Sequence, residues 1–311
     1  MPPAKGGGME ISMKKSQVRR IINLPFGTIT VYSKNKELCG GVLNSGRYNT
    51  FFSEVNYNVY LGWDFENVDT TYRATQMKKG IYLGHNVGEP CKLHICQNDI
   101  HIYTENEQLY DKIFWSFVVK YIFTKACLDN DILHLKATLL RDIRDGMCVV
   151  LLGKGGSGKT TLADKLCERN FELLSNTHCM VKDDYIWGVN SWVRRRKNSI
   201  EKYELEKKDF ILDGVIKKCI MVEGNSENNK LHIETLTIDE KYYYLKNFSA
   251  AISNYDLKEE VCDYMAENNT MIVEYLKKED ELVKRFSERE ILWIKLDSFE
   301  KECIEQLIDE I

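Results

Sequence analysis

A glycine-rich octapeptide that ends in a lysine and a hydroxyl residue carries the most specific chemistry in this sequence. It runs from Gly153 to Thr160 and follows the pattern G-x-x-x-x-G-K-T. Glycines let such a loop curl until successive backbone N–H groups point inward, which creates an anion-binding nest at the start of a helix. The lysine of this pattern, Lys159, reaches the β- and γ-phosphates of a nucleotide, and the hydroxyl of Thr160 coordinates Mg²⁺. The residues predicted to bind the nucleotide are Gly153, Lys154, Gly155, Gly156, Ser157, Gly158, Lys159, Thr160 and Thr161.

The segments that flank this motif are those that a P-loop requires. Met147 to Leu152 is an apolar run typical of a buried strand, and Lys159 to about Arg169 has the pattern of a helix. A last helix is expected to begin at Asp297, with Glu300 completing a capping box. Strands that alternate with helices indicate an α/β core. Further strands are expected at Ile132 to Leu140, Phe171 to Ser175, Tyr185 to Val189, Lys218 to Glu223, His232 to Leu236 and Ile291 to Leu296.

The hydrophobic pattern divides the chain into two folded parts. Gly27 to Tyr32, Val55 to Trp63 and Lys92 to Tyr103 are rich in alternating β-branched and aromatic residues, which predicts strands. Tyr110 to about Leu128 then changes to helical spacing with one broad apolar face. We therefore expect a tag or disordered leader at residues 1–13, a β-rich domain at 14–107 and a P-loop α/β domain at 108–311.

Composition narrows the class of protein. Of 311 residues, 43% are hydrophobic and 29% charged, the balance of a folded chain. The formal net charge of −4 gives no basic field for a nucleic acid, so we expect no nucleic-acid partner. None of the ten cysteines forms a Cys-x-x-Cys pair, which is typical of reduced thiols in the cytoplasm. The longest aromatic and aliphatic stretch, Ile113 to Phe123, is shorter than the about 20 residues that cross a membrane, so no membrane partner is expected.

Two families of different class resemble the loop. Lys154 to Thr160 resembles the deviant Walker motif, K-G-G-x-G-K-T, of the partitioning ATPases, in which the first lysine acts across a dimer. That family places its motif near the N-terminus, whereas about 150 residues precede it here. The acidic residues that this family carries on its next strand are also absent.

The second resemblance is longer and runs from Leu133 to about Arg196. Leu133-His134 precedes the loop, Glu168 to Ser175 gives a turn and a strand, and Gly188 to Arg194 a turn that ends in arginine. This pattern is similar to the HPr kinase family and its relatives that phosphorylate peptides in natural-product gene clusters. The resemblance implies an α/β fold with a mixed sheet, like that of HPr kinase and PEP carboxykinase, and it implies ATP and Mg as cofactors.

Those kinases carry two aspartates, which serve the metal and the acceptor hydroxyl. This chain has other residues at both positions. Asn176 and Thr177 stand at those positions, and asparagine offers an oxygen to Mg²⁺ but takes no proton. Asn176 is therefore a candidate metal ligand beside Thr160 and a candidate member of the catalytic group. The other candidate catalytic residues are His134, Asp183 and Arg194, with His178, Asp184 and Arg196 as neighbours of the same kind.

Each of these candidates also has a structural interpretation. His134 on an apolar strand is compatible with a core histidine, and Asp183 is compatible with a solvated turn. The run from Arg194 to Lys197 is compatible with an exposed loop, although a guanidinium also clamps phosphate oxygens well. The sequence leaves these alternatives open.

The function expected from the sequence is an ATP- and Mg²⁺-dependent kinase that acts on a hydroxyl of a peptide, protein or small metabolite. The β-rich domain would bind that acceptor or a partner, and homo-oligomer formation stays open. One alternative is a nucleotide-gated binding module that performs no phosphoryl transfer. The other is an ATPase switch of the partitioning type.

Overall fold

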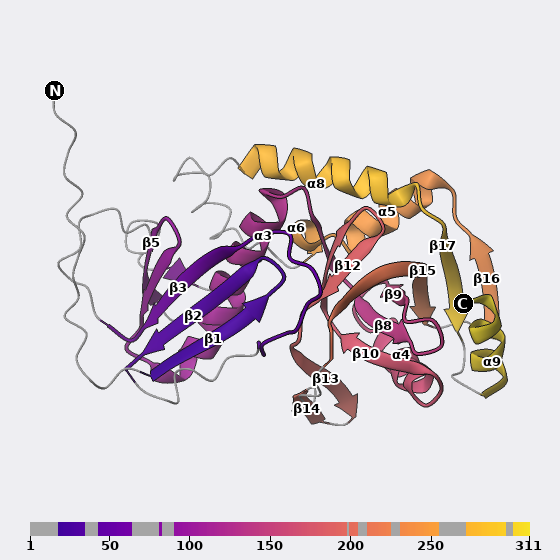
Figure 1. Ribbon diagram of the computed structural model, residues 1–311, viewed down its shortest axis with the longest axis horizontal. Helices are drawn as coiled ribbons and strands as arrows, with labels where there is room; N and C mark the ends of the chain where they lie inside the picture. Colours follow the sequence, from indigo (N-terminus) through magenta and orange to yellow (C-terminus); the bar gives the residue numbers. More distant parts are fainter. Residues whose placement is uncertain are drawn as a thin grey trace.

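The protein is a mixed α/β molecule with mixed sheets, seen in a computed structural model (Figure 1). The structure describes residues 18–34, 43–63, 81–82, 90–197, 199–204, 210–224, 231–254, 272–296 and 301–311. The expected leader at 1–13 and the expected capping box at Asp297 lie outside these residues.

The N-terminal part is a six-stranded sheet in the order β1-β2-β3-β6-β5-β4. Strands β2, β3 and β6 run parallel to one another, and the other neighbours pair antiparallel. Alternating residues such as Ile29, Val31, Tyr57 and Val59 are buried on one face, as the period of a strand requires. The strands are β1 (Val18–Leu24), β2 (Gly27–Ser33), β3 (Val55–Leu61), β4 (Ile81–Tyr82), β5 (Pro90–Cys96) and β6 (Asp99–Tyr103).

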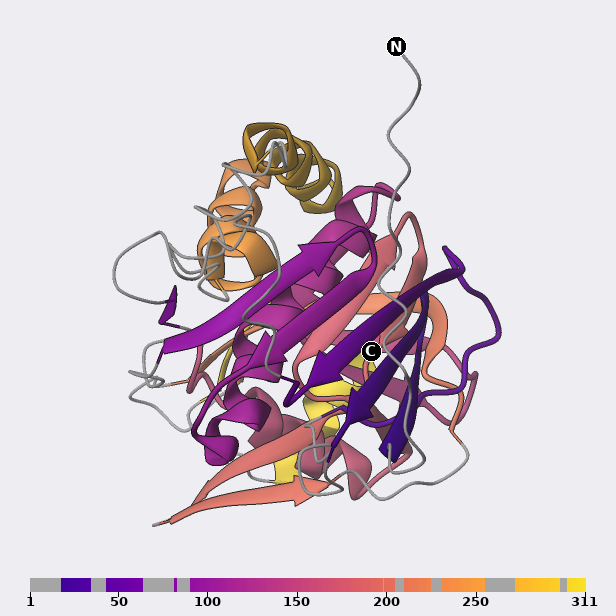
Figure 2. The same ribbon diagram turned by 90° about the vertical axis from the view of Figure 1, so that its left-hand side faces the viewer.

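A helical segment covers the buried face of this sheet. Its side chains Ile113, Val118, Ile122 and Phe123 belong to the same buried cluster as the sheet residues. Figure 2 shows the indigo and purple strands in front of the magenta part of the chain. The single helix expected here is divided by a π-helical segment. Its elements are η2 (Glu107–Leu109), α2 (Tyr110–Ile113), η3 (Phe114–Val119) and α3 (Lys120–Leu128).

The second sheet has nine strands and is organised around the long strand β15. Strands β9 and β17 run parallel to β15, and β12 pairs with it antiparallel. Seven of the strands follow the order β10-β8-β9-β15-β12-β11-β7. Strand β17 also pairs with β15, and β16 pairs with β17. The strands are β7 (Leu133–Lys136), β8 (Thr138–Asp142), β9 (Cys148–Leu152), β10 (Phe171–Ser175), β11 (His178–Lys182), β12 (Tyr185–Gly188), β15 (Asp213–Gly224), β16 (Leu231–Thr235) and β17 (Ile291–Leu296). A separate two-stranded ribbon consists of β13 (Trp192–Lys197) and β14 (Ser199–Glu204).

The strand expected from Ile132 to Leu140 is divided at Ala137. β7 pairs with β11 and β8 with β10, so the two halves form one long antiparallel ribbon. The pairing of this ribbon is irregular between Leu173 and Ser175. At the junction the Ala137 N–H donates to the Thr177 carbonyl oxygen at 3.2 Å. The break in register therefore lies in the middle of the ribbon, next to residues 176 and 177.

Helices cover both faces of the second sheet. Helices α4 and α9 pack on one face with Val149, Leu151 and Ile220. Helices α5 and α8 pack on the other face, with Val150 and Met221 in the same cluster. The helices are α4 (Lys159–Cys167), α5 (Ile238–Phe248), α6 (Ala251–Asn254), α8 (Ile272–Ser287) and α9 (Lys301–Glu310).

The buried carboxylate of Asp213 joins the N-terminal part to the second sheet. It accepts hydrogen bonds from the backbone N–H groups of Asn49 and Thr50, at 3.0 and 2.9 Å, and from the hydroxyl of Tyr185 at 2.9 Å. Nearby, the Tyr48 hydroxyl donates to the Gly188 carbonyl oxygen at 3.0 Å. A buried carboxylate needs such donors to replace water. Residues 48–50 are therefore fastened to strands β12 and β15.

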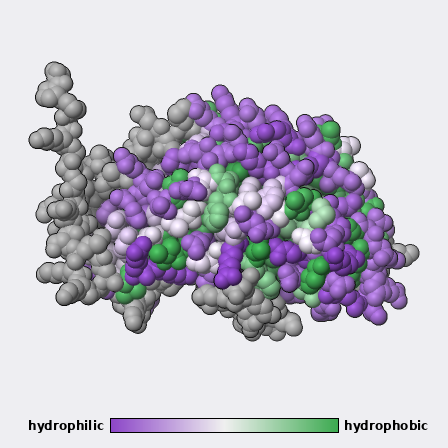
Figure 3. Space-filling view, viewed as in Figure 1, coloured by the Kyte–Doolittle hydropathy of each residue, from purple (hydrophilic) through white to green (hydrophobic). Residues whose placement is uncertain are grey.

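On the face seen in Figure 3, hydrophobic groups occur as small separate areas among hydrophilic ones. The exposed large apolar side chains belong to several elements and include Ile21, Phe51, Ile211, Val215 and Leu276. Among the helices that the structure describes, none has the length and apolar composition needed to span a bilayer.

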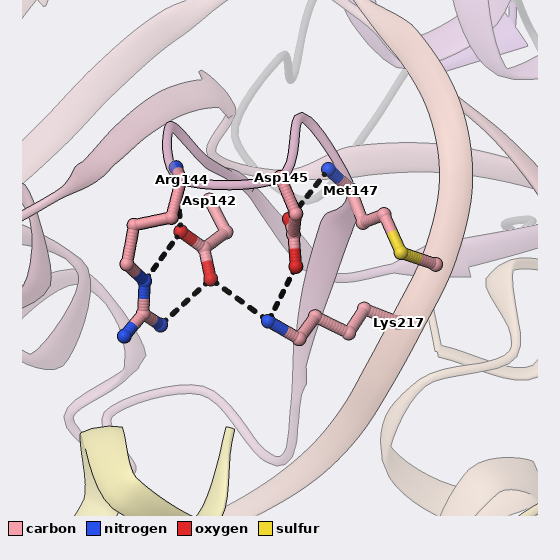
Figure 4. A network of polar contacts seen from close by, with 5 residues as sticks. All are labelled: Asp142, Arg144, Asp145, Met147 and Lys217. Carbon is pink, nitrogen blue, oxygen red and sulfur yellow. Dashed lines mark hydrogen bonds and ion pairs between the residues drawn. The ribbon is translucent and has the colours of Figure 1, made fainter.

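A second polar network fixes the β8–β9 hairpin, and Figure 4 shows it. The fully buried carboxylate of Asp142 accepts hydrogen bonds from Nε and Nη2 of Arg144, at 2.9 and 2.7 Å, and from Nζ of Lys217 at 3.0 Å. Lys217 Nζ also contacts Asp145 at 2.6 Å. Arg144, followed by Lys217, holds the pKa of Asp142 far below its usual range.

We predict that Asp142→Asn lowers the free energy of unfolding by about 2 kcal/mol at pH 7, because two cations lose a buried partner but keep access to water. A carboxylate with a depressed folded pKa stabilises above its unfolded pKa of about 4, and this contribution disappears as the pH falls further. The difference from wild type should therefore be constant near neutrality and shrink below about pH 4. Urea unfolding at several pH values measures it. Asp145→Asn, which changes a partly exposed member of the network, should cost less, and equal losses would contradict this assignment.

Candidate functional site

The glycine-rich loop joins β9 to α4 and contains three glycines in the left-handed region. Their φ angles are 130° at Gly153, 84° at Gly156 and 92° at Gly158, values that side chains rarely permit. At Gly153 a Cβ atom would lie 2.5 Å from the carbonyl oxygen of Val222 on β15. At Gly155 and Gly156 a Cβ atom would meet no atom within 4 Å. The start of the loop is thus pressed against β15, and its middle is accessible.

Helix α4 begins directly after this loop, above the ends of β9 and β15. Its residues Leu162, Ala163 and Leu166 are fully buried against the sheet, which fixes the direction of the helix axis. The first N–H groups of a helix have no acceptor within the helix and carry a partial positive charge. The accessible part of the loop therefore lies at a positive helix end.

Lys159 folds back over the loop. Its Nζ donates hydrogen bonds to the carbonyl oxygens of Gly153 at 2.6 Å and Lys154 at 2.8 Å. Burial, followed by the positive charge of Lys136, lowers the pKa of Lys159 to about 8. Both effects disfavour the charged form of the amine. An anion at the loop would act in the opposite direction and stabilise that charge.

The structure brings together the two predicted metal ligands. The Thr160 hydroxyl donates to Oδ1 of Asn176 at 3.2 Å. Asn176 follows the last residue of β10, and its carbonyl oxygen accepts from the Thr138 hydroxyl at 3.1 Å. Two side-chain oxygens, one from the start of α4 and one from the residue after β10, therefore lie within hydrogen-bond distance. Thr161, one residue further along α4, is exposed.

The structure places His134 in a buried pair of imidazoles. Nε2 of His134 and Nδ1 of His178 are 2.9 Å apart, and the two rings stack with centroids 5.1 Å apart. Phe123 of α3 packs its ring against both, at 5.5 Å. Burial lowers the pKa of His134 to about 3, and it also lowers the pKa of His178, with a further contribution from His134. This environment is that of a core histidine, the structural alternative that the sequence left open.

Asp183 is not brought to the glycine-rich loop. It lies with Asp184 in the turn between β11 and β12, and its φ angle is 48°. The five residues of β11 separate this turn from the Asn176 end, a span of about 16 Å in an extended strand. Asp184 forms an ion pair with Arg289 at 2.7 Å. The pair of aspartates therefore corresponds to the solvated turn rather than to the phosphate end of the site.

Arg194 lies on the ribbon formed by β13 and β14, where its Cα is paired with that of Lys202. The segment that leads into β13 lies close to the C-terminal end of β10. There the Ser175 hydroxyl donates to the carbonyl oxygen of Val189 at 2.9 Å. The side chains of Arg194 and Arg196 lie outside the described residues. A role for either arginine therefore stays a prediction.

Sequence reasoning missed Lys136, the last residue of β7. Its charge acts on both Lys159 and His178, so it belongs to the surroundings of the loop. The only local signal is a lysine at the end of the apolar strand pattern Leu133-His134-Leu135. That signal predicts the end of a strand, but it does not indicate which residues, distant in sequence, lie beside Lys136.

No protein-family model and no curated protein matches this chain. The interpretation of the site therefore depends on the geometry of the described residues and on the motif itself.

We predict that the imidazole of His134 stays neutral in the folded protein from pH 8 down to about pH 4, because its pKa is lowered to about 3. A histidine whose folded pKa is depressed destabilises the fold as the pH falls below its unfolded pKa of about 6.5. The free energy of unfolding should accordingly decline through that range. Imidazole NMR shifts, assigned with a His134→Gln variant, report the titration. A midpoint between pH 6 and 7 would show an accessible imidazole and return His134 to the catalytic candidates.

Proposed function

We propose that this chain is an ATP- and Mg²⁺-dependent phosphotransferase with a P-loop core similar to that of HPr kinase. It transfers the γ-phosphoryl group to a hydroxyl of a peptide, protein or small metabolite. The observation that carries this proposal is the pairing of Thr160 with Asn176 at 3.2 Å beside a glycine loop closed by Lys159.

The backbone of the loop suits a polyphosphate. Glycines at positive φ turn successive N–H groups inward, and the positive end of α4 adds a favourable potential. Lys159 already bonds two loop carbonyl oxygens, so its ammonium group lies at the loop that we propose binds the β- and γ-phosphates of a nucleotide. It can exchange these neutral acceptors for phosphate oxygens. The stronger charge-assisted hydrogen bonds favour that exchange.

The donor atoms fit Mg²⁺. This cation prefers oxygen ligands and keeps several waters, so two protein oxygens together with phosphate oxygens are sufficient. Thr160 supplies a hydroxyl and Asn176 an amide oxygen, and Thr138 fixes the backbone of Asn176. When bound, the cation would neutralise charge on the β- and γ-phosphates.

In this proposal, residues of the chain position the phosphates and offset their negative charge. Neither Asn176 nor Thr177 can accept the proton of an acceptor hydroxyl at neutral pH. Phosphoryl transfer depends mainly on alignment and electrostatic stabilisation, so transfer is compatible with this pair of residues.

A second candidate function is a nucleotide-gated binding module, and the uncharged pair Asn176 and Thr177 favours it. The two candidates differ in one measurement. Incubation with γ-labelled ATP and pools of hydroxyl-bearing peptides and metabolites would label an acceptor if the chain is a kinase. Nucleotide binding without any labelled product, under conditions in which the protein stays folded, would select the module.

We predict that Lys159→Ala weakens ATP binding by at least about 100-fold, because at least two charge-assisted hydrogen bonds are lost. Isothermal titration calorimetry with Mg²⁺ measures the affinity. Lys165→Ala is the matched control, since this lysine lies in the last turn of the same helix and forms an exposed ion pair with Glu168. Unchanged ATP affinity in Lys159→Ala would remove the loop from the proposed function.

We predict that Asn176→Asp tightens the apparent binding of Mg²⁺ in the presence of ATP by about tenfold, because a carboxylate is a stronger ligand for a hard cation than an amide oxygen. Titration of Mg²⁺ at fixed ATP concentration reports the change. Asn170→Asp adds the same charge at an exposed position before β10 and should have little effect. Equal responses of the two variants would mean that charge alone, rather than ligation at residue 176, causes the effect.

A further inference from the structure

Two asparagines, Asn44 and Asn190, lie opposite each other where the N-terminal part meets the second sheet. The Asn44 backbone N–H donates to the Asn190 carbonyl oxygen at 3.1 Å, and Leu43 forms an antiparallel bridge with Ser191. In antiparallel pairing, opposite residues place their side chains on the same face, and the next residues along the chain use the other face. The register therefore assigns Asn44 and Asn190 to one face and Ser191 to the other.

The side-chain amides of both asparagines are buried, and each has one atom without a hydrogen bond. Asn44 is 2% exposed and Asn190 is 9% exposed. Within the described residues, neither Nδ2 of Asn44 nor Oδ1 of Asn190 has a hydrogen-bond partner. Native proteins rarely leave buried polar atoms unpaired, because each loses its water without compensation. One face thus carries a donor and an acceptor that a further polar group would satisfy.

The chemistry of this pair selects a neutral ligand. Nη2 of Arg20 donates to Oδ1 of Asn44 at 3.3 Å and also to the Leu43 carbonyl oxygen. Because a guanidinium only donates, this contact sets the orientation of the Asn44 amide and leaves Nδ2 as a donor. An anion would meet the lone pairs of Asn190 Oδ1 and is disfavoured. The C=O and N–H of one residue in an extended peptide point the same way and match both atoms.

Principles of chain geometry connect this pair to the nucleotide loop. The Ser175 hydroxyl donates to the carbonyl oxygen of Val189 at 2.9 Å, and Val189 directly precedes Asn190. Ser175 itself precedes Asn176, whose amide oxygen accepts from Thr160 at 3.2 Å. An extended peptide advances about 3.3 Å per residue. A peptide held at the asparagine pair can therefore extend a few residues to the Asn176 end of the loop.

We propose that Asn44 and Asn190 bind the backbone of a peptide acceptor. Nδ2 of Asn44 donates to a carbonyl oxygen of the peptide, and Oδ1 of Asn190 accepts from the N–H of the same peptide residue. This inference rests on the proposed function and names its substrate class, a peptide rather than a small metabolite. The side chains come from both folded parts of the chain, so the N-terminal part contributes directly to the site.

The test compares peptide phosphorylation by wild type and Asn190→Leu. The probes are γ-labelled ATP and hexapeptides blocked at both ends, each with one serine, threonine or tyrosine. We expect the variant to raise the KM for peptide by about tenfold, the value of one hydrogen bond, and to change kcat and the KM for ATP by less than about threefold. Its thermal midpoint should stay or rise, because an unpartnered buried atom is replaced by an apolar group.

Two further variants complete the comparison. Asn44→Asp keeps the shape of the side chain and the contact with Arg20 but exchanges the Nδ2 donor for an acceptor, so it should raise the KM for peptide in the same way, and it replaces Asn190→Leu if that variant does not fold. Ser191→Ala is the matched control. It removes a hydroxyl that is equally buried and unpartnered, on the other face, and should leave the KM for peptide unchanged.

An unchanged KM for peptide in both asparagine variants, or an equal rise in Ser191→Ala, would overturn the inference. So would a lower thermal midpoint of Asn190→Leu with unchanged KM, which indicates a purely structural role, or labelling of glycerol and free serine in preference to the peptides.

Peptide binding is also measured without transfer, through the side-chain amide NMR signals of Asn44, which the Asn44→Asp variant assigns. If these signals move when the hexapeptides are added but wild type labels no acceptor, the proposed function fails and the peptide site stands. If transfer occurs and the signals stay in place, the inference fails and the proposed function stands.

Discussion

The site depends on the close approach of the glycine-rich loop to the end of β15. A Cβ atom at Gly153 would lie 2.5 Å from the Val222 carbonyl oxygen, and one at Gly224 would lie 3.1 Å from the Ser157 carbonyl oxygen. A side chain at Gly153 would clash with the backbone of β15, whereas one at Gly224 would require a small shift of the loop. This contact, together with the buried side of α4, directs the start of the helix over the strand ends. The position of the N-terminal end of α4 is therefore a consequence of packing between two backbones.

The second element of the site is the irregular middle of the ribbon formed by β7, β8, β10 and β11. There the register shifts near Ser175, and the chain delivers Asn176 to Thr160. The same ribbon buries His134 and His178 under α3 and carries Asp183 away to its distal turn. One register thus determines which polar residues reach the loop and which do not.

The charges near the loop differ from those of a site built on paired aspartates. Asn176 and Thr177 are neutral, while Lys159 and Lys136 are positive. In the proposed kinase, charge on the phosphates would be neutralised by Lys159 together with the metal, instead of by a metal held mainly by carboxylates. Alignment of the phosphates would then depend on the backbone of the loop, and Asp213 ties the N-terminal part to the sheet that carries this loop.

The sequence by itself determined the features that are continuous along the chain. The loop, the strand before it and the helix after it were predictable from glycine spacing and an apolar run, and β10 and β17 have the expected bounds. Strand β11, the division of β7 from β8 and the burial of His134 were decided only by tertiary structure. Their physical reason is pairing between segments about 40 residues apart, which sets the register and hence the face on which each side chain lies. For the same reason the sequence did not show that Asp183 lies in the distal turn, away from the glycine-rich loop.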